Sequence, residues 1–527
     1  MRRELVLPLV VFFGMILFPY IFAAISAGPD YHFGGFLFNV YDGNSYLAKI
    51  YEGYRGDWRF TLPYTAEPGR GAYLFLFYIL LGHISRWSSI SPIYIFHFAR
   101  IISAGLLAAA LYLLVVMTSI KNSGSIWGFT LLLLGSGCGW LLSLWGRLGA
   151  DFWVAEAYPF LSSYATPHFA LGLALLVWIF LEAARHRPGV RGMLVICLSF
   201  CLSIIAPFAV VVAAAVLAAV STWEIFVNLL NLPVRSTVTD EPEFGRPGST
   251  QAFFALVMVL AGGVPFLIYQ LLAIRSDPVL SGWNAQNLTP SIPVWNVIVS
   301  MSPAIFAGTL WLFFAWRRKH EINLLSSIWL LAGFLLLYVP FDLQRRFMMG
   351  LFIPAACLAG AGIQALAGNS PRKANLLGVA LVLFSMITNL VILASTFHGI
   401  SSRDPHIYLS QDEAAALEWI VGNTEEQALV LASPEMGLFI PAHTGRRVIY
   451  GHPFETVNAA EEKQAVISFY STTTDMDRQA FLDERKVDYV FMGERERSYR
   501  PPEMPDTLLP VYSTAEVVIY RVANPLD

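Results

Sequence analysis

Residues 5–25 read LVLPLVVFFGMILFPYIFAAI, an uncharged apolar run long enough to span a bilayer. Arg2 and Arg3 precede it, but no clear small-residue cleavage site follows. We therefore predict a first transmembrane helix and not a removable signal peptide. The whole chain has the same character, since 56% of its 527 residues are hydrophobic and 13% are charged, whereas soluble domains average about 25% charged residues. This composition predicts a polytopic membrane protein and excludes a purely soluble enzyme.

Apolar runs of spanning length recur through the first 400 residues. They lie at 99–119, 126–146, 168–183, 251–273, 295–316, 322–341, 347–368 and 374–396, and Pro207 divides a longer run, 192–228, into a predicted hairpin of two short helices.

The run 71–84 could either cross the membrane or lie at its surface. The surface placement puts the basic segments at Arg2/Arg3, Lys121, 185–191, 317–319 and 372–373 on the cytoplasmic side, as the positive-inside rule expects. We therefore predict eleven spans, with the N-terminus in the cytoplasm and the C-terminus outside.

Charge gathers at the C-terminal end, where residues 401–527 hold 21 of the 37 acidic and 11 of the 34 basic residues. Strand-like runs at 428–432, 448–450, 488–492, 508–512 and 516–521 alternate with helix-like runs at 411–421, 458–470 and 475–485. We predict an all-α polytopic membrane domain over 1–396, followed by a small soluble α/β domain over 401–527. The net charge of −3 argues against a nucleic-acid-binding surface.

The predicted topology places two long loops, 27–98 and 147–167, on the outer side together with the tail. Loops of such length are often functional. Asp42 in the first loop could be a general base toward an acceptor hydroxyl or amine, although Asp42-Gly43 is also a common turn. Asp151 and Glu156 in the second loop could orient an acceptor or hold a divalent cation. By default they are ordinary loop acids.

Arg345 and Arg346 fall on the outer side, against the positive-inside trend. Paired guanidinium groups suit a phosphate, and they could stabilise it as a leaving group. The alternative is a pair of side chains that anchors a helix at the membrane surface.

Three further residues are weaker candidates for substrate binding. His168 follows Thr166-Pro167, a pattern typical of a helix start. Trp283 and Asn284 could contact a sugar, but aromatic residues also form the interfacial belt of membrane proteins.

This layout resembles the GT-C superfamily of integral-membrane glycosyltransferases, which includes protein mannosyltransferases and lipid A aminoarabinose transferases. The resemblance covers residues 1–396. It rests on Asp42 in the first external loop, on an acid in the second, on Ala99-Arg100-Ile-Ile-Ser-Ala-Gly105 at the start of the second span, and on Arg345/Arg346. The tail is similar to extracytoplasmic domains that some members append.

The resemblance implies a catalytic or acceptor-activating role for Asp42, with Glu156 or Asp151 as the second acid. It implies that Arg345/Arg346 contact polyprenyl phosphate and that the run 71–84 is interfacial. The donor would be a polyprenyl-phosphate sugar, and the acceptor an extracytoplasmic lipid, polysaccharide or protein. Gly43 stands where mannosyltransferases often have Glu, so a divalent metal stays open. The Trp-Trp-Asp motif of oligosaccharyltransferases is absent, which argues against asparagine-linked transfer.

We therefore predict a membrane glycosyltransferase of a bacterial-type inner membrane, with membrane lipids as further partners. Two other classes remain as alternatives. A lipid or polymer translocator would need a continuous polar path, which the sparse charges inside the spans do not supply. A non-catalytic membrane scaffold would leave Asp42, Glu156 and Arg345 far apart.

Overall fold

The computed structural model describes residues 5–117, 123–184, 190–229, 249–318, 323–471, 477–501, 504 and 508–523. The chain forms two compact units that interleave along the sequence. The first contains 1–18, 98–269 and 289–395, and the second contains 19–97, 270–288 and 396–527. Arg2, Arg3, Lys121, 185–189 and Lys319 lie outside the described residues, so the orientation deduced from the basic segments stays a prediction.

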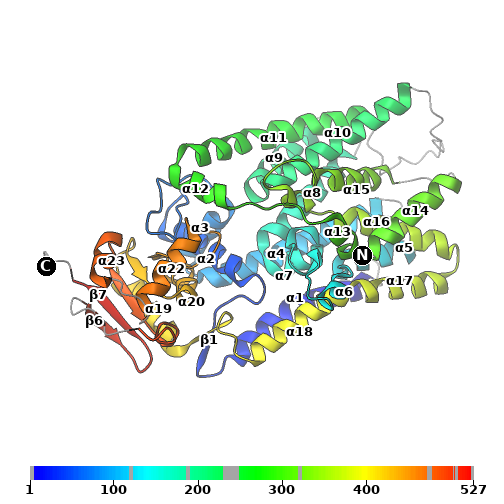
Figure 1. Cartoon of the computed structure of the whole chain (residues 1–527). Helices are drawn as coiled ribbons and strands as arrows, with labels where there is room; N and C mark the ends of the chain where they lie inside the picture. The colour runs from blue at the N-terminus through cyan, green and yellow to red at the C-terminus, as the bar shows by residue number, and fades with distance from the viewer. Residues whose placement is uncertain are drawn as a thin grey trace. The chain divides into compact units, whose positions relative to one another are not determined.

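The apolar part of the chain is helical (Figure 1). Its α-helices are α1 (Val6–Ser26), α4 (Pro92–Met117), α5 (Ser123–Leu134), α6 (Gly139–Ser143), α7 (Pro159–Ala165), α8 (Pro167–Ala183), α9 (Val190–Ile205), α10 (Pro207–Leu229), α11 (Ser249–Ser276), α13 (Val294–Ser300), α14 (Ala304–Arg318), α15 (Leu324–Leu336), α16 (Phe352–Ala367), α17 (Pro371–Ser385) and α18 (Ile387–Ser401). Three short 3-10 helices lie in the connections, η2 (Ala150–Phe152), η3 (Ala155–Ala157) and η4 (Gln344–Met348).

Six helices among the described residues are long and apolar enough to cross a membrane. Two bent pairs, α13 with α14 and α17 with α18, raise this number to eight if each pair forms one span. Three shorter apolar helices, 167–183, 192–205 and 324–336, coincide with predicted spans. The helix break at Pro207 is confirmed, since α10 begins there. The integral-membrane character is therefore supported, and the count of eleven stays a prediction.

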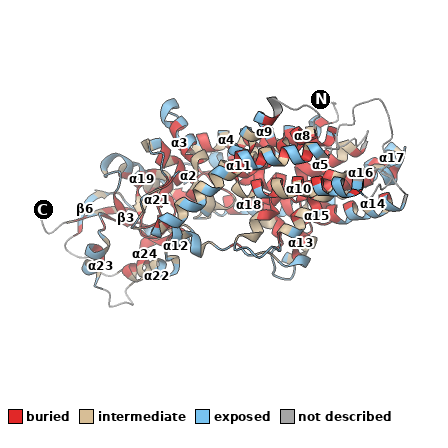
Figure 2. Cartoon of the chain, turned by 90° about the horizontal axis from the view of Figure 1, so that it is seen from above, coloured by how far each residue is buried: buried red, intermediate tan, exposed pale blue. Residues whose placement is uncertain are grey.

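Burial separates central from peripheral helices within the first unit (Figure 2). The window that contains α16 is 78% buried, whereas the window in α11 is 28% buried. At the α5–α16 contact, a Cβ on Gly360 would lie 2.9 Å from the Cα of Gly128. Small residues let helix backbones approach closely where lipid supplies no hydrophobic driving force. The exposed apolar side chains of α11 are what a lipid-facing helix requires.

The second unit contains a five-stranded sheet in the order β4-β3-β5-β7-β6. The strands are β3 (Leu429–Leu431), β4 (Arg447–Val448), β5 (Tyr489–Met492), β6 (Leu508–Ser513) and β7 (Val518–Val522). β3 is parallel to β4 and β5, whereas β7 is antiparallel to β5 and β6. The helices of the tail are α19 (Gln411–Asn423), α20 (Pro434–Gly437), α21 (Phe439–Thr444), α22 (Ala459–Tyr470), α23 (Arg478–Arg485) and α24 (Glu494–Arg497). Each strand and helix predicted in the tail is present, which confirms the small α/β region.

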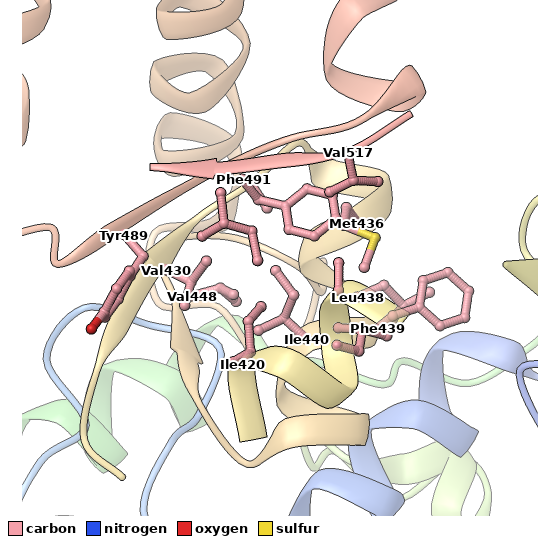
Figure 3. Close-up of a cluster of buried hydrophobic side chains, with 14 of the residues drawn as sticks. Ile420, Val430, Met436, Leu438, Phe439, Ile440, Val448, Tyr489, Phe491 and Val517 are labelled. Atoms are coloured by element: carbon pink, nitrogen blue, oxygen red, sulfur yellow. The ribbon is translucent and has the colours of Figure 1, made fainter. Parts of the chain in front are cut away.

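Alternate side chains of the strands enter two apolar clusters, as the two-residue period of a strand dictates. Figure 3 shows the cluster that contains Val430, Val448 and Phe491, packed against side chains of α19 and α21. The same cluster includes Ala48 and Tyr64 from the first loop. The first loop therefore supplies part of the hydrophobic core of the tail.

The first loop and the tail are also joined by strand pairing. β1 (Tyr31–Phe33) is antiparallel to β2 (Tyr408–Ser410). This pairing and the shared core explain why the tail forms one unit with 19–97, whereas the sequence predicted a linear division into 1–396 and 401–527.

Two helices of the first loop pack backbone against backbone. They are α2 (Val40–Arg55) and α3 (Leu76–Ser88). A Cβ on Gly82 would collide with the carbonyl oxygen of Ile50, and a Cβ on Gly53 would collide with that of Ile79. α3 has 13 residues, too few to cross a hydrocarbon core of about 30 Å at ~1.5 Å per residue. This agrees with the prediction that the run 71–84 does not span the membrane.

Candidate functional site

Asp42 lies in the first turn of α2, within the second unit. The helix begins after Asn39, whose φ of 47° is left-handed. Gly43 is required here because a Cβ at this position would collide with the ring of Phe36. Asp42-Gly43 is therefore part of a helix and not the turn that was the alternative. The side chain of Asp42 is 45% exposed, and the N-terminal turn of a helix favours its negative charge.

His452 from the tail faces this carboxylate, with Nε2 3.9 Å from Oδ1 of Asp42 and 1% of its side chain exposed. Its Nδ1 accepts the backbone N–H groups of Phe454 at 3.0 Å and Glu455 at 3.2 Å. Burial lowers the pKa of His452, although the carboxylates of Glu455 and Asp42 oppose this effect. The imidazole is therefore neutral at neutral pH.

Glu455 connects the same turn to α2 through a buried ion pair. Its Oε1 lies 2.8 Å from Nζ of Lys49, whose side chain is 1% exposed. Ser45 Oγ donates to the same carboxylate at 2.8 Å and accepts from Lys49 at 2.6 Å. The ammonium also lies 4.4 Å from the ring centroid of Phe75. Burial alone would raise the pKa of Glu455, but Lys49, His452 and the hydrogen bonds outweigh it and hold that pKa below its usual range.

These groups lie at one edge of the tail sheet, where the parallel strands end. Glu435 follows β3, Tyr450 and His452 follow β4, and Tyr499 follows β5. Tyr499 donates its hydroxyl to Glu435, with both carboxylate oxygens at 3.0 Å. Burial, with the neighbouring Tyr41 and Glu435, raises the pKa of Tyr450 to about 12. Ligands in parallel sheets bind beyond the carboxyl ends of the strands, so this edge is a candidate binding site.

In the first unit, Glu156 and Arg346 are brought together. Glu156 Oε1 lies 3.3 Å from Nη1 of Arg346, with 7% of the Glu156 side chain and 35% of the Arg346 side chain exposed. The backbone N–H of Gly350 donates to the Glu156 carbonyl oxygen at 2.9 Å, which fixes η3 beside the residues that follow η4. The second-loop acid predicted from the sequence therefore orients one guanidinium of the predicted arginine pair.

Arg345 points to a different neighbour. Its guanidinium carbon lies 4.6 Å from the ring centroid of Trp153, a distance at which a cation and an aromatic face attract. The backbone N–H of Arg345 donates to the carbonyl oxygen of Thr289, and the backbone N–H of Thr289 donates to the carbonyl oxygen of Asp342 at 2.9 Å. The two arginines thus leave η4 with different partners in the second loop.

Asp151 is fully buried. Its carboxylate accepts the backbone N–H groups of Gly137 and Gly139 at 3.1 and 3.0 Å, and the Thr388 hydroxyl at 2.7 Å. Burial raises its pKa to about 6, against the opposing effect of these hydrogen bonds. These contacts join the second loop to α6 and α18 and give Asp151 a structural role.

Arg100, part of the stretch that carried the family resemblance, is also buried. It donates to the carbonyl oxygens of Ile16, Ser163 and Tyr164 at 3.1, 3.2 and 3.4 Å. One guanidinium therefore joins α1, α4 and α7 within the first unit.

The three weaker candidates have ordinary structural neighbours. His168 is the second residue of α8, after Thr166 at the N-cap and Pro167 at the first helical position, and its ring centroid lies 4.0 Å from that of Phe169. Trp283, on α12 (Pro278–Gln286), packs against an apolar cluster of the first loop, while Asn284 is exposed.

The site of the second unit contains residues that the sequence did not single out. His452 lies two residues past a predicted strand, and the rule that sites gather at the carboxyl ends of parallel strands could have indicated it. Lys49 and Glu455 are 406 residues apart, and no local pattern relates them. Asp42 lies in one unit and Glu156, Arg345 and Arg346 in the other, so their predicted convergence stays a prediction.

The fold defines a class, a helical membrane protein with an α/β region at its C-terminus. No family model matches the chain, and no curated protein matches it in sequence. Solved structures do match. The oligosaccharyltransferase AglB from Archaeoglobus fulgidus, in complex with an inhibitory peptide and a dolichol-phosphate, gives a TM-score of 0.54 at 12% identity over 93% of this chain and 69% of that one. ArnT from Cupriavidus metallidurans, bound to undecaprenyl phosphate, gives 0.50 at 11% identity over 98% and 99%.

At these identities the likeness shows the fold alone, and that fold agrees with the architecture that the sequence predicted. The Archaeoglobus fulgidus protein also matches as a complex with Zn and sulfate, with a TM-score of 0.53, 12% identity and coverage of 93% of this chain and 68% of that one. Among the residues described here, no group of three or more His, Cys, Asp or Glu side chains could hold a metal ion. We therefore assign no step to a metal.

Proposed function

We propose that this protein is a membrane glycosyltransferase that moves a sugar from a polyprenyl-phosphate-linked donor to an acceptor at the extracytoplasmic surface of a bacterial-type inner membrane. The observation that carries the proposal is the accessible carboxylate of Asp42 in a GT-C fold, at the N-terminus of α2 and beside the strand ends of the tail. Matching structures contain dolichol-phosphate in one case and undecaprenyl phosphate in another. This supports a polyprenyl phosphate as the class of donor.

In the proposed reaction, Asp42 removes a proton from an acceptor hydroxyl or amine. The acceptor atom attacks the anomeric carbon, and the bond between that carbon and the phosphate oxygen breaks. Polyprenyl phosphate leaves with the electron pair of this bond. Arg345 and Arg346 neutralise the negative charge of the departing phosphate, because guanidinium groups offer several fixed donors to its oxygens.

The other candidates support these roles. Glu156 holds Arg346 in place through their ion pair, so we assign it to donor positioning. His168, Trp283 and Asn284 are assigned to the outer contacts of donor or acceptor. The N-terminus lies in the cytoplasm and the tail outside in this proposal, which places Asp42 on the side where the lipid-linked sugar is consumed.

The proposal is tested with the full chain in lipid nanodiscs and a panel of radiolabelled undecaprenyl-phosphate sugars, by measuring the release of undecaprenyl phosphate in the presence of membrane extract. Asp42→Asn is expected to lower kcat by about 10²–10⁴-fold, the usual contribution of a general base, with little change in donor KM. Arg346→Ala is expected to raise donor KM. Asp404→Asn is the matched control, because Asp404 is also an aspartate beside a histidine, His406, at 3.1 Å in the same unit. Undiminished transfer by Asp42→Asn would refute the proposed role.

A further inference from the structure

The buried imidazole of His452 has one nitrogen occupied and one turned toward Asp42. Among the described residues, Nε2 has no hydrogen-bond partner and is shielded from solvent. The nearest carboxylate oxygen, Oδ1 of Asp42, lies 3.9 Å away. A polar atom buried without a hydrogen bond is costly, so its place beside the proposed base calls for an explanation.

The contacts of the other ring nitrogen fix the tautomer. Nδ1 accepts two backbone N–H groups, those of Phe454 and Glu455. A nitrogen that accepts hydrogen bonds must carry its lone pair, so in the neutral ring the proton resides on Nε2. His452 therefore presents an N–H donor to Asp42 and cannot take a proton from it through that nitrogen.

The backbone of Tyr41 also acts on the ring as a hydrogen-bond acceptor, so it shares this donor with Asp42, whereas the charged groups nearby have partners of their own. Lys49 lies between Ser45 and Glu455, and its ammonium is engaged by both. The rings of Tyr41 and Tyr64 lie 5.8 and 5.7 Å from the imidazole centroid. Asp42 and Glu455 are the carboxylates that act on His452, and Glu455 already pairs with Lys49.

We propose that His452 is a positioning residue for Asp42, with the tail donating an N–H that orients one carboxylate oxygen and favours its ionised form. The inference rests on the proposed function, in which Asp42 is the base. A donor that bonds the charged form of a carboxylate favours that form. The second oxygen is then free to take the acceptor proton. Catalytic hydrogen bonds often shorten in the substrate complex, so we expect the separation of 3.9 Å between Nε2 and Oδ1 to close when the acceptor binds.

The variants must separate the positioning of Asp42 by His452 from the contribution that His452 makes to the stability of the turn 452–456. Asn at position 452 offers its Oδ1 at the same number of bonds from the backbone as Nδ1, so His452→Asn keeps an acceptor for the two N–H groups. It removes the donor that faces Asp42. His452→Ala removes both. We expect His452→Ala to lower the thermal midpoint of the full chain and His452→Asn to leave it close to that of the unmodified protein.

The first measurement, an NMR experiment on His452, does not depend on glycosyl transfer activity. In full-length protein labelled with ¹⁵N-histidine, the His452 signal is assigned by its loss in His452→Asn or His452→Gln. We expect the shift pattern of a neutral ring protonated at Nε2. Asp42→Asn removes a negative neighbour and should lower the pH at which His452 titrates. An Nδ1–H tautomer, or a titration that Asp42→Asn leaves unchanged, overturns the inference.

The second readout is the pH profile of undecaprenyl phosphate release. His452→Asn removes the N–H donor, so a hydrogen bond that favours a charged carboxylate is lost. The acid limb of kcat/KM should then move to higher pH by roughly 0.5–1 unit, which corresponds to about 3–10-fold lower kcat/KM on the acid side. His398→Asn, a change at an exposed histidine of the same unit, is the control and should leave the profile unchanged.

Different results would refute the proposed function of Asp42 and the positioning role of His452. If Asp42→Asn abolishes transfer while His452→Asn keeps the original acid limb, the inference is wrong and the proposed function stands. If Asp42→Asn shifts the His452 titration but leaves transfer intact, the contact is real and the proposed function is wrong.

Discussion

The ion pair between Lys49 and Glu455 gives the most quantitative test of how the tail is held to the first loop. Both groups are buried at 2.8 Å separation, with 1% and 12% of their side chains exposed. Glu455→Gln removes the charge but keeps the shape, and it leaves an ammonium buried without its counter-charge. Breaking a buried pair in this way costs about 3–5 kcal/mol. For a unit of this size we expect a fall of roughly 6–20 °C in the thermal midpoint.

A double-mutant cycle isolates the pairwise part of this loss. Lys49→Met strands the carboxylate and should be destabilising by a similar amount. Met keeps the apolar stem and packs well against the surrounding aromatic rings, so the double variant Lys49→Met/Glu455→Gln should be more stable than either single variant. The assay is fluorescence-monitored thermal unfolding of the full chain in one detergent. The prediction is refuted if the losses of stability in the two single variants simply add in the double variant, or if each single variant loses less than about 1 kcal/mol. Either result would show that the two side chains are not coupled as a buried ion pair.

Four further predictions follow from the second unit. Gly82→Ala should lower the free energy of unfolding by about 1–3 kcal/mol, because the new Cβ collides with the backbone of α2. Gly422→Ala is the control and should not destabilise the protein, because its Cβ would meet no atom within 4 Å. The thermal midpoints of the two variants are compared. Asp277→Ala should cost about 1 kcal/mol, since its carboxylate caps α12 through the N–H groups of Val279 and Leu280, and Asp277→Asn should restore most of that loss. The lowered pKa of Glu455 means that its stabilisation is present above the unfolded glutamate pKa of about 4.3 and is lost as pH falls through the folded value, so acid should lower the midpoint of the unmodified chain more than that of Glu455→Gln. A chain ending at residue 400 should be highly susceptible to protease within 27–98, because that loop loses its core partners; full resistance would contradict the shared core.

Local patterns explain what the sequence predicted well. Apolar runs with few charges mark the spanning helices, and Pro207 marks the helix break because proline lacks the N–H that a helix interior needs. The strand at 488–492 is found as β5 (Tyr489–Met492) because short β-branched and aromatic runs between turns are a local signal. The run 295–316, predicted as one span, is two helices bent by 92°. Pro303, which lies near the break, could have indicated from the sequence that the helix is interrupted.

The interleaved units depended on contacts that no local pattern contains. The register of β1 with β2 joins residues near 32 to residues near 409, and either strand alone is too short to stand out. The candidate site shows the same division. Asp42 was predicted from its place in the first loop. The ion pair between Glu156 and Arg346 was not predicted, and the roles of both residues stay predictions. His452 required the tertiary structure, because its importance comes from a neighbour 410 positions earlier in the chain.

The arrangement of side chains along α2 suggests why the tail packs with the first loop in one unit. The first turn of α2 carries an accessible carboxylate, while the following turns carry Ser45 and a buried lysine. A lysine at 1% exposure is stable only with a fixed counter-charge, and that charge comes from Glu455 in the turn that also carries His452. The same five-residue turn therefore fixes the position of the helix and presents a donor to its catalytic candidate. Any movement of the tail that broke the Lys49–Glu455 pair would also withdraw His452 from Asp42, so in this structure stability of the second unit and the proposed chemistry of Asp42 are physically linked.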